Sequence, residues 1–258
     1  MAIKLKSAWE IERMADAGRM LTEVFSEIEK AIRPGVTTLE LDTLAREATI
    51  SRKAKPGFLG LYGFPFTLCV SKNEVVIHGF PDKDPLREGD LVSIDAGLFY
   101  QGYAADMART YMVGKVSPEA EKLVKVTEQA FWVGLEAMQP GKRTGDIAHA
   151  VQSYVEGQGL WVVREFVGHG LGREMHEDPQ LPNFGSPGQG PRLRPGMTLA
   201  FEPMVTLYPA KVVILEDGWT ATSGKGNLAA HYENTVLITE SGPRLLTGSP
   251  RGVPAVAS

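Results

Sequence analysis

Apolar residues recur three or four positions apart along much of the first fifty residues. The segment 7–10 (SAWE) has the sequence of a capping box, and the apolar pattern after it runs to Ile32, where the Pro-Gly pair at 34–35 ends it. A second capping box at 37–40 (TTLE) opens another apolar stripe that continues to about Ser51. The chain is therefore predicted to begin with a long helix followed by a shorter one.

The same order of elements returns in the second half of the chain. The pair 117–118 (SP) is a good N-cap and first helical position, and the helix predicted after it continues to Met138, before the Pro-Gly pair at 140–141. A shorter helix is predicted over 144–156.

These two stretches form a weak internal repeat. Residues 31–45 align with residues 137–151 on the Pro-Gly pair, a threonine and an acidic residue. Two copies of a helix-helix-strand unit predict two halves related by a pseudo-two-fold axis, with a site where their sheets face each other.

Short runs of β-branched and aromatic residues separate the helices. Bounded by Gly, Pro and Asn, such runs predict strands. Strands are expected near 64–71, 161–166, 198–203 and 232–239, with a short apolar run at 75–77 before His78. We also expect an irregular aromatic segment over 55–62, a loop over 183–196, and a hairpin or loop over 217–227.

The stretch 91–111 (LVSIDAGLFYQGYAADMARTY) is predicted to be a β-hairpin. Its β-forming residues run to Phe99, the residues 100–102 can turn, and an extended pattern resumes after them. An odd register places Asp95 and Asp106 on one face, where the two carboxylates repel each other unless a cation lies between them. Two solvated aspartates on an edge hairpin are the alternative reading of this stretch alone.

Composition narrows the class of protein. The 258 residues are 43% hydrophobic and 22% charged, an ordinary globular composition for one domain or two small ones. A net charge of -4 and a pI near 5.8 argue against nucleic acid as the main partner. Cys69 is the one cysteine, no secretory pattern is present, and no apolar run reaches about 18 residues. We expect a cytoplasmic protein that is not associated with a membrane.

Three polar residues interrupt apolar or glycine-rich segments in the second half. His169 lies between Gly168 and Gly170, which allow a ligand to approach closely. Glu202 and Glu233 lie inside apolar strand patterns, where burying a carboxylate is costly unless it is paired or liganded. These residues are therefore candidates for a functional site.

Together with the hairpin aspartates they form a set of metal-ligating residues: Asp95, Asp106, His169, Glu202 and Glu233. Four carboxylates and one imidazole suit a pair of hard or borderline divalent ions better than a single zinc, whose structural sites prefer sulfur and nitrogen. Because a metal pair activates water and polarises a carbonyl or phosphoryl oxygen, the set predicts a hydrolase.

Five local sequences occur in an order that is similar to one family. They are NEVVIHGFP around His78, the D-x10-D of the hairpin, VVREFVGHGLGREMHEDPQ, PGMTLAFEPMV and DGWTATSGKGNLAAHYENTVLIT. Together they resemble the short bacterial form of type I methionine aminopeptidases, in metallopeptidase family M24, over residues 3–246.

The resemblance implies an α+β pita-bread fold, as in creatinases and aminopeptidases. In that fold an internal pseudo-two-fold α-α-β repeat surrounds a central antiparallel sheet, which would explain the repeat between 31–45 and 137–151. It also implies a single catalytic metallopeptidase domain over residues 1–258, and we expect a flexible C-terminal tail over about 248–258.

The metal ligands follow from the resemblance as well. Asp95 would chelate one metal ion, Asp106 and Glu233 would bridge two, and His169 and Glu202 would complete the shell of the second. The implied cofactors are two divalent ions per chain, from Co, Mn, Fe, Zn and Ni.

The resemblance further implies the removal of the initiator methionine from nascent proteins whose second residue is small. Glu202 would relay a proton from the bridging water to the leaving amine, His176 would hydrogen-bond the developing oxyanion, and His78 would hold the scissile amide. The ribosome surface would be a partner, and the enzyme would be a monomer.

A methionine pocket is implied by positions that match the family's. Its side chains would form an apolar slot for a thioether, with the two catalytic histidines also contacting the substrate. The substrate-binding set is Phe58, Leu61, Phe64, Cys69, Met175, Trp219, His78 and His176.

The chain departs from the family pattern near the pocket and the metal ligands. Tyrosine is usual at Leu61 and Phe64, phenylalanine at Met175, threonine or a similar residue at Gly97, glutamine at His231 and histidine at Asn234. The extra imidazole beside the last ligand would alter the hydrogen bonds around the ligands and the preference for a metal.

Two other functions fit parts of the pattern. A proline-dipeptide or Xaa-Pro peptidase of the same superfamily also resembles IDAGLFYQGYAADMART, although such enzymes normally carry a separate domain ahead of the site, and Asp95 leaves no room for one. A non-catalytic pita-bread binding protein would have lost ligands, whereas all five ligand positions are filled here.

Overall fold

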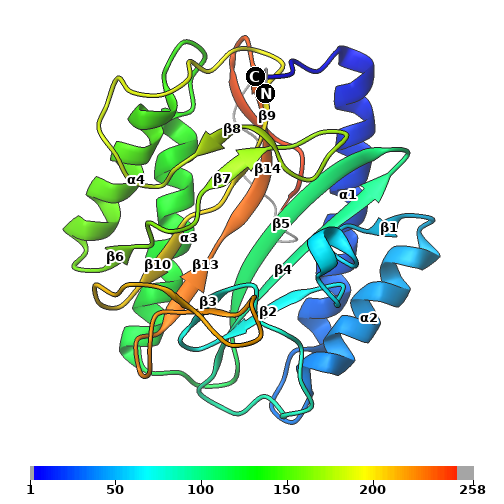
Figure 1. The fold of residues 1–258 in the computed structure, drawn as a ribbon, viewed down its shortest axis with the longest axis vertical. Helices are drawn as coiled ribbons and strands as arrows, with labels where there is room; N and C mark the ends of the chain where they lie inside the picture. Colours follow the sequence, from blue (N-terminus) through cyan, green and yellow to red (C-terminus); the bar gives the residue numbers. More distant parts are fainter. Residues whose placement is uncertain (1–2, 249–258) are drawn as a thin grey trace.

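The computed structural model describes residues 3–248, which fold as two helix pairs beside a central sheet (Figure 1). The helices are α1 (Ala8–Ala31), α2 (Thr38–Ser51), α3 (Pro118–Ala137) and α4 (Thr144–Gly157). The predicted capping boxes are confirmed, since Ser7 and Glu10 bond reciprocally at the start of α1, as do Thr37 and Glu40 at the start of α2. Apart from Gly248, the tail predicted over about 248–258 lies outside the described residues.

One large sheet forms the centre of the molecule, with the strand order β1-β4-β5-β14-β9-β7-β8 and with β2 on β4 and β15 on β14. Its described pairings are antiparallel, as predicted. The strands are β1 (Lys55–Pro56), β2 (Cys69–Lys72), β4 (Leu91–Tyr100), β5 (Tyr103–Met112), β7 (Gly168–Gly170), β8 (Glu177–Leu181), β9 (Thr198–Phe201), β14 (Glu233–Thr239) and β15 (Gly242–Leu245).

Two small sheets and one helical turn complete the structure. The small sheets have the orders β13-β10-β6 and β11-β12-β3. Their strands are β3 (Val75–Ile77), β6 (Trp161–Val162), β10 (Met204–Thr206), β11 (Val213–Ile214), β12 (Ala221–Thr222) and β13 (Ala229–His231), and the turn is a 3-10 helix at Leu61–Gly63. Within residues 3–248, no helix is both long enough and apolar enough to span a bilayer.

The strand predicted over 64–71 is correct only at its end, because β2 begins at Cys69. The Asp42 carboxylate accepts hydrogen bonds from the backbone N–H groups of Thr67 and Leu68, both at 2.8 Å, and so holds this backbone away from a strand ladder. The strand predicted over 161–166 is likewise reduced to β6.

The predicted pseudo-two-fold is visible in the hydrogen bonds that follow each Pro-Gly pair. The N–H of Gly35 donates to the Leu86 carbonyl, and the N–H of Gly141 donates to the Leu193 carbonyl. Both glycines have a positive φ, which a residue with a side chain adopts only with strain. Each helix pair is therefore anchored in the same way to a segment that leads into the central sheet, the first before β4 and the second before β9.

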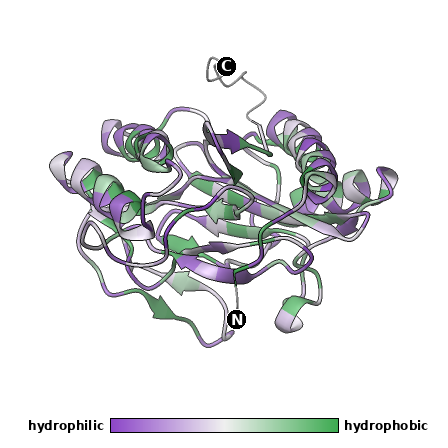
Figure 2. Ribbon diagram, turned by 90° about the horizontal axis from the view of Figure 1, so that it is seen from above, coloured by the Kyte–Doolittle hydropathy of each residue, from purple (hydrophilic) through white to green (hydrophobic). Residues whose placement is uncertain are grey.

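Two apolar clusters hold the helix pairs on one face of the sheet, as the view from above shows (Figure 2). Phe25 of α1 lies in one cluster with Ile94 of β4. In the other, Phe131 of α3 packs on Phe201 of β9 with ring centroids 5.1 Å apart. Gly134 allows this approach, because a Cβ there would collide with the Phe201 ring. Full burial of each such side chain contributes roughly 1.5–3 kcal/mol.

Candidate active site

The hairpin β4–β5 places its two aspartates as predicted. Tyr100 pairs with Tyr103 around a two-residue turn whose residues both have positive φ angles. In this register Asp95 lies opposite Ala108, two residues from Asp106, so both carboxylates leave the same face of the sheet as diagonal neighbours. Both side chains are buried, so the alternative of two solvated aspartates is wrong.

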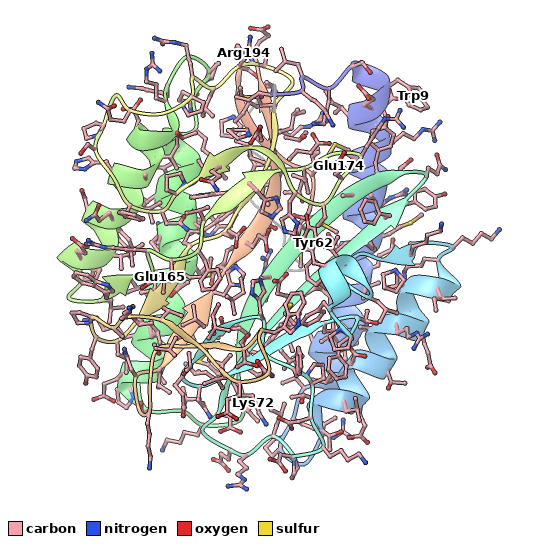
Figure 3. The ribbon with its side chains drawn as sticks, in the orientation of Figure 1. Trp9, Tyr62, Lys72, Glu165, Glu174 and Arg194 are labelled. Atoms are coloured by element: carbon pink, nitrogen blue, oxygen red, sulfur yellow. The ribbon has the colours of Figure 1, made fainter. Side chains whose placement is uncertain are left out.

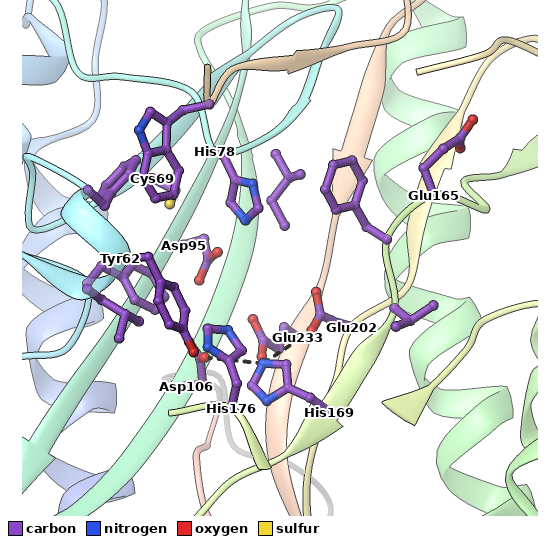
Figure 4. Close-up of a pocket in the computed structure, with 17 residues that line it drawn as sticks. Tyr62, Cys69, His78, Asp95, Asp106, Glu165, His169, His176, Glu202 and Glu233 are labelled. Atoms are coloured by element: carbon purple, nitrogen blue, oxygen red, sulfur yellow. Dashed lines mark ion pairs between the residues drawn. The ribbon is translucent and has the colours of Figure 1, made fainter. Parts of the chain in front are cut away.

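The remaining candidate ligands come from neighbouring strands. Glu233 of β14 pairs with Ala108 of β5, and His169 of β7 pairs with Ala200 of β9, two residues before Glu202. Figure 4 shows these side chains and the two aspartates converging on one region. Nε2 of His169 lies 3.6 Å from Oε1 of Glu202.

Burial makes it unfavourable for the four carboxyl groups of this cluster to be ionised without a cation. It raises the pKa of Asp95 to about 7, and burial is also the largest cause of the pKa values of Asp106, Glu202 and Glu233 lying well above their usual range. Neighbouring carboxylates add to the increase at Asp106 and Glu233. A cation among these groups would allow all four carboxylates to ionise.

The donor atoms fit a metal centre. Among residues 3–248, Oδ1 of Asp95 and Oε1 of Glu233 are buried without a hydrogen-bond partner. Asp106, His169 and Glu233 each offer a ligand atom within 4.8 Å of the others. Two ligand atoms that each lie about 2.1 Å from one ion are about 3.0 Å apart when the angle at the ion is a right angle. They are about 4.2 Å apart when they lie on opposite sides of the ion. The His169–Glu202 separation of 3.6 Å falls in this range.

His169 is also held in a tautomer suited to a metal. Its Nδ1 lies 2.9 Å from the Gly170 carbonyl, which accepts a hydrogen bond from Nδ1–H, so the lone pair on Nε2 faces the carboxylates. Burial lowers the pKa of His169 to about 4, so the ring is neutral at neutral pH.

A cavity of about 360 Å³ opens beside the ligand cluster. Its walls combine the carboxylates and His169 with apolar and aromatic side chains, as Figure 4 shows. The structure brings together in this lining most of the predicted substrate-binding residues: Phe58, Leu61, Phe64, Cys69, His78, His176 and Trp219. Met175 does not line the cavity; it is buried in the apolar cluster behind Phe58.

The two predicted catalytic histidines lie on different sides of the cavity. The His78 ring packs edge-on against Phe166 and Trp219, with centroids 5.4 and 6.3 Å away. The His176 ring lies 4.4 Å from the His169 ring and stacks on Tyr62 at 5.7 Å. Burial lowers the pKa of His78 to about 4 and also lowers that of His176, so both are neutral hydrogen-bonding groups.

Sequence reasoning missed several residues of the lining. Figure 3 labels two of them, Tyr62 and Glu165, which lie to either side of β14 in that view. The others are Ile77, Phe166 and Val167. Tyr62 ends the predicted aromatic segment and 165–167 precede His169, so their neighbourhood in sequence was a usable signal.

His231 and Asn234, the two residues near Glu233 that differ from the family pattern, have different surroundings. The Asn234 side chain accepts a hydrogen bond from Arg109 at 2.8 Å and is fully buried. His231 is 1% exposed, and its Nε2 lies 3.6 Å from Oε2 of Glu202. The extra imidazole predicted beside the ligands is therefore directed at them.

A central antiparallel sheet with candidate carboxylate and histidine ligands at its middle is typical of a metal-dependent hydrolase, and the family comparison agrees. The family model described as metallopeptidase family M24 matches residues 12–240, and the chain belongs to that family. Within it, the chain is 51% identical to a methionine aminopeptidase of Clostridium perfringens, over 95% of this chain and 98% of that protein. It is 45% identical to methionine aminopeptidase 1 of Bacillus subtilis, over 94% and 98%.

Solved structures give the same result. The crystal structure of methionine aminopeptidase from Thermotoga maritima is 45% identical, with a TM-score of 0.94, and covers 96% of this chain and all of that one. A prolidase from Pyrococcus furiosus is 23% identical, with a TM-score of 0.79, and this chain covers 66% of it. The resemblance to methionine aminopeptidases and the pita-bread fold are thus confirmed, whereas the prolidase shares the fold alone.

Proposed function

We propose that the chain is a methionine aminopeptidase, a metal-dependent hydrolase that removes the N-terminal methionine from new proteins whose second residue is small. One observation carries this proposal: the apolar cavity is walled on one side by the five candidate metal ligands. A thioether side chain in the apolar part would bring the first peptide bond to the ligands.

Two divalent ions suit the ligand set better than one. Asp95 would hold the first ion, Asp106 and Glu233 would lie between the two, and His169 with Glu202 would complete the second. Four carboxylates around one divalent ion would leave excess negative charge, whereas two divalent ions balance them. Ions from Co, Mn, Fe, Zn and Ni are candidates. When bound, they would polarise the scissile carbonyl and favour ionisation of a water molecule.

The protein side chains supply the proton transfer and orientation. Glu202 accepts the proton of the attacking water and passes it to the leaving amine. His176 donates a hydrogen bond to the oxygen of the scissile carbonyl as negative charge develops on it. His78, on the opposite wall, holds the scissile amide. Their lowered pKa values support these roles, because a neutral imidazole donates one hydrogen bond without adding charge.

The pocket explains the expected selectivity. Phe58, Phe64 and Trp219 offer aromatic surfaces, and the Cys69 thiol is small and polarisable, which suits the methionine thioether. Leu61 contributes a further apolar surface, and Met175 supports Phe58 from behind. A bulky second residue would collide with the walls beyond the ligands. The substrates are nascent chains, and we place a monomeric enzyme in the cytoplasm at the ribosome surface.

Peptide hydrolysis tests the proposal directly. The purified chain is loaded with Co, Mn or Fe in turn and incubated with Met-Ala-Ser, with a Met-Xaa-Ser series, and with Gly-Pro and Ala-Pro-Ala. We expect release of methionine, declining as Xaa becomes larger, and no cleavage of the proline peptides. Cleavage of Gly-Pro in preference to Met-Ala-Ser, or no methionine release with any metal, would contradict the assignment.

A further inference from the structure

His231 has a buried nitrogen that faces the metal ligands and has no partner among the described residues. The side chain is 1% exposed, and Nε2 makes no hydrogen bond within residues 3–248. Its nearest charged neighbours are Oε2 of Glu202 at 3.6 Å and Oε2 of Glu233 at 4.0 Å. A polar atom left unpaired at this depth is costly unless something binds there.

The geometry of His231 matches that of His169. Nε2 of His169 lies 3.6 Å from Oε1 of Glu202 and 3.9 Å from Oδ2 of Asp106. The two histidines therefore face the two oxygens of one glutamate at equal distances. Both distances at His231 fall between about 3.0 and 4.2 Å, the range expected for two ligands of one ion. They are too long for direct hydrogen bonds.

The backbone of His231 is fixed by the strands that carry the other ligands. Its N–H donates to Oγ1 of Thr110 at 2.8 Å, and its carbonyl accepts from the same hydroxyl at 2.9 Å. Thr110 lies on β5, which also carries Asp106. In addition, His231 is among the residues around a second cavity of about 350 Å³, bordered by α1 and α3 residues including Glu29 and Glu128.

We infer that Nε2 of His231 is an additional ligand of a divalent ion held by Glu202 and Glu233, an inference that rests on the proposed metal-dependent function. The centre then has two imidazole nitrogens, one from each side of Glu202. A second nitrogen ligand favours borderline ions such as Co, Ni and Zn over Mn.

Cobalt(II) loading of the whole chain tests this inference. An imidazole bound through Nε2 keeps its proton on Nδ1, and the paramagnetic ion shifts that exchangeable proton far from the ordinary range of the NMR spectrum. We expect two such resonances in the unmodified protein and one in both His231→Gln and His231→Ala. Calorimetric Co(II) affinity should fall at least about tenfold in both variants. His149→Gln, at an exposed position on α4, should retain two resonances and the original affinity.

The possible outcomes distinguish His231 as a metal ligand from His231 as a hydrogen-bond donor to Glu202. They also distinguish failure of this inference from failure of the proposed function. A single shifted resonance in the unmodified protein overturns the inference without any variant. Full Co(II) affinity in His231→Gln, with loss in His231→Ala, overturns it too, because a glutamine amide can replace a donor to Glu202 but is a poor ligand. Two resonances without methionine release would leave the ligand in place and refute the proposed function.

Discussion

The terminal methyl of Met175 occupies the space that a side chain on Gly97 would need. A Cβ built on Gly97 would collide with that methyl and would lie 2.9 Å from Cε1 of Phe58. The same methyl also blocks a Cβ on Gly57. Met175 therefore fills a notch between two glycines, directly behind the Phe58 wall of the cavity.

An added Cβ should be tolerated differently at the two glycines, because the atoms with which it collides differ in how easily they can move. A Cβ on Gly57 would lie 2.7 Å from the backbone carbonyl carbon of Gly97, which cannot move aside, so Gly57→Ala should destabilise the protein by about 1–3 kcal/mol. At Gly97 the main obstacle is a flexible side chain. Gly97→Ala and Met175→Ala should therefore couple favourably, by on the order of 1 kcal/mol.

Urea unfolding of the single and double variants measures this coupling. Gly157→Ala is the control, because a Cβ at the end of α4 meets nothing within 4 Å, and it should change stability by less than about 0.5 kcal/mol. Strict additivity of Gly97→Ala and Met175→Ala would show that Met175 does not set the space at Gly97.

Metal-free protein should lose stability as the pH rises above about 6.5. Folded Asp95 keeps its proton to about pH 7, and Asp106, Glu202 and Glu233 keep theirs well above the usual range, whereas unfolded carboxyls ionise near pH 4. Raised pKa values give stability that is lost as the pH rises through them. Below about pH 6.5 the buried histidines offset this trend, because unfolding lets them take up protons.

Thermal unfolding from pH 6.5 to 8.5, with EDTA or with Co(II), checks this prediction. A metal at about one hundred times its Kd adds roughly 2.7 kcal/mol, or roughly 5–10 °C in Tm for a chain of this size. The gain should increase with pH because the carboxylates ionise to bind the ion. A Tm in EDTA that does not fall between pH 7 and 8.5 would show that these carboxylates are already ionised without metal.

Glu202→Gln should abolish most activity without unfolding the protein. The amide keeps the shape of the side chain but cannot accept a proton, so kcat on Met-Ala-Ser should fall at least about 100-fold. At pH 8 the metal-free variant should be as stable as the parent or more so, because one acid leaves a crowded buried cluster. Glu165→Gln, an exposed position on the cavity wall, should keep kcat within a few-fold. A near-normal kcat in Glu202→Gln would show that Glu202 does not carry out the proton transfer.

The elements predicted correctly are those that depend on residues close together in the sequence. Ser7 and Glu10 lie three residues apart and cap α1 with each other, and the Gln101-Gly102 turn sets the register that places Asp95 and Asp106 on one face. A side chain far away in sequence overrode the end of the strand pattern over 64–68, because Asp42 of α2 binds the backbone N–H groups of Thr67 and Leu68.

The assembly of the site depends on pairings that the sequence pattern does not display. His169 reaches Glu202 because β7 pairs with β9, and both strands are too short to give an alternating pattern. One usable signal was missed: Asp95 and Glu202 each lie nine residues after a leucine in similar segments, LREG at 86–89 and LRPG at 193–196. That similarity relates the two candidate ligands by the internal repeat.

Lys6 anchors the loop that carries His176. Its Nζ lies 2.7 Å from Oε2 of Glu177, and both side chains are almost fully buried. The other oxygen of Glu177 accepts a hydrogen bond from the N–H of Arg173 at 3.1 Å. Burial would raise the pKa of Glu177, but the hydrogen bond and charge of Lys6 outweigh it and hold the pKa below its usual range.

Lys6→Met should therefore cost about 3–5 kcal/mol, because it leaves the Glu177 carboxylate buried without its cation. Adding Glu177→Gln should restore part of that loss, since the unpaired charge is removed. Lys4→Met is the matched control: its ammonium lies 3.6 Å from the same carboxylate but is half exposed, so it should cost less than about 1 kcal/mol. Urea unfolding gives the stabilities, and kcat on Met-Ala-Ser reports whether His176 has moved. Equal losses in Lys6→Met and Lys4→Met would mean that the buried pair does not anchor the loop.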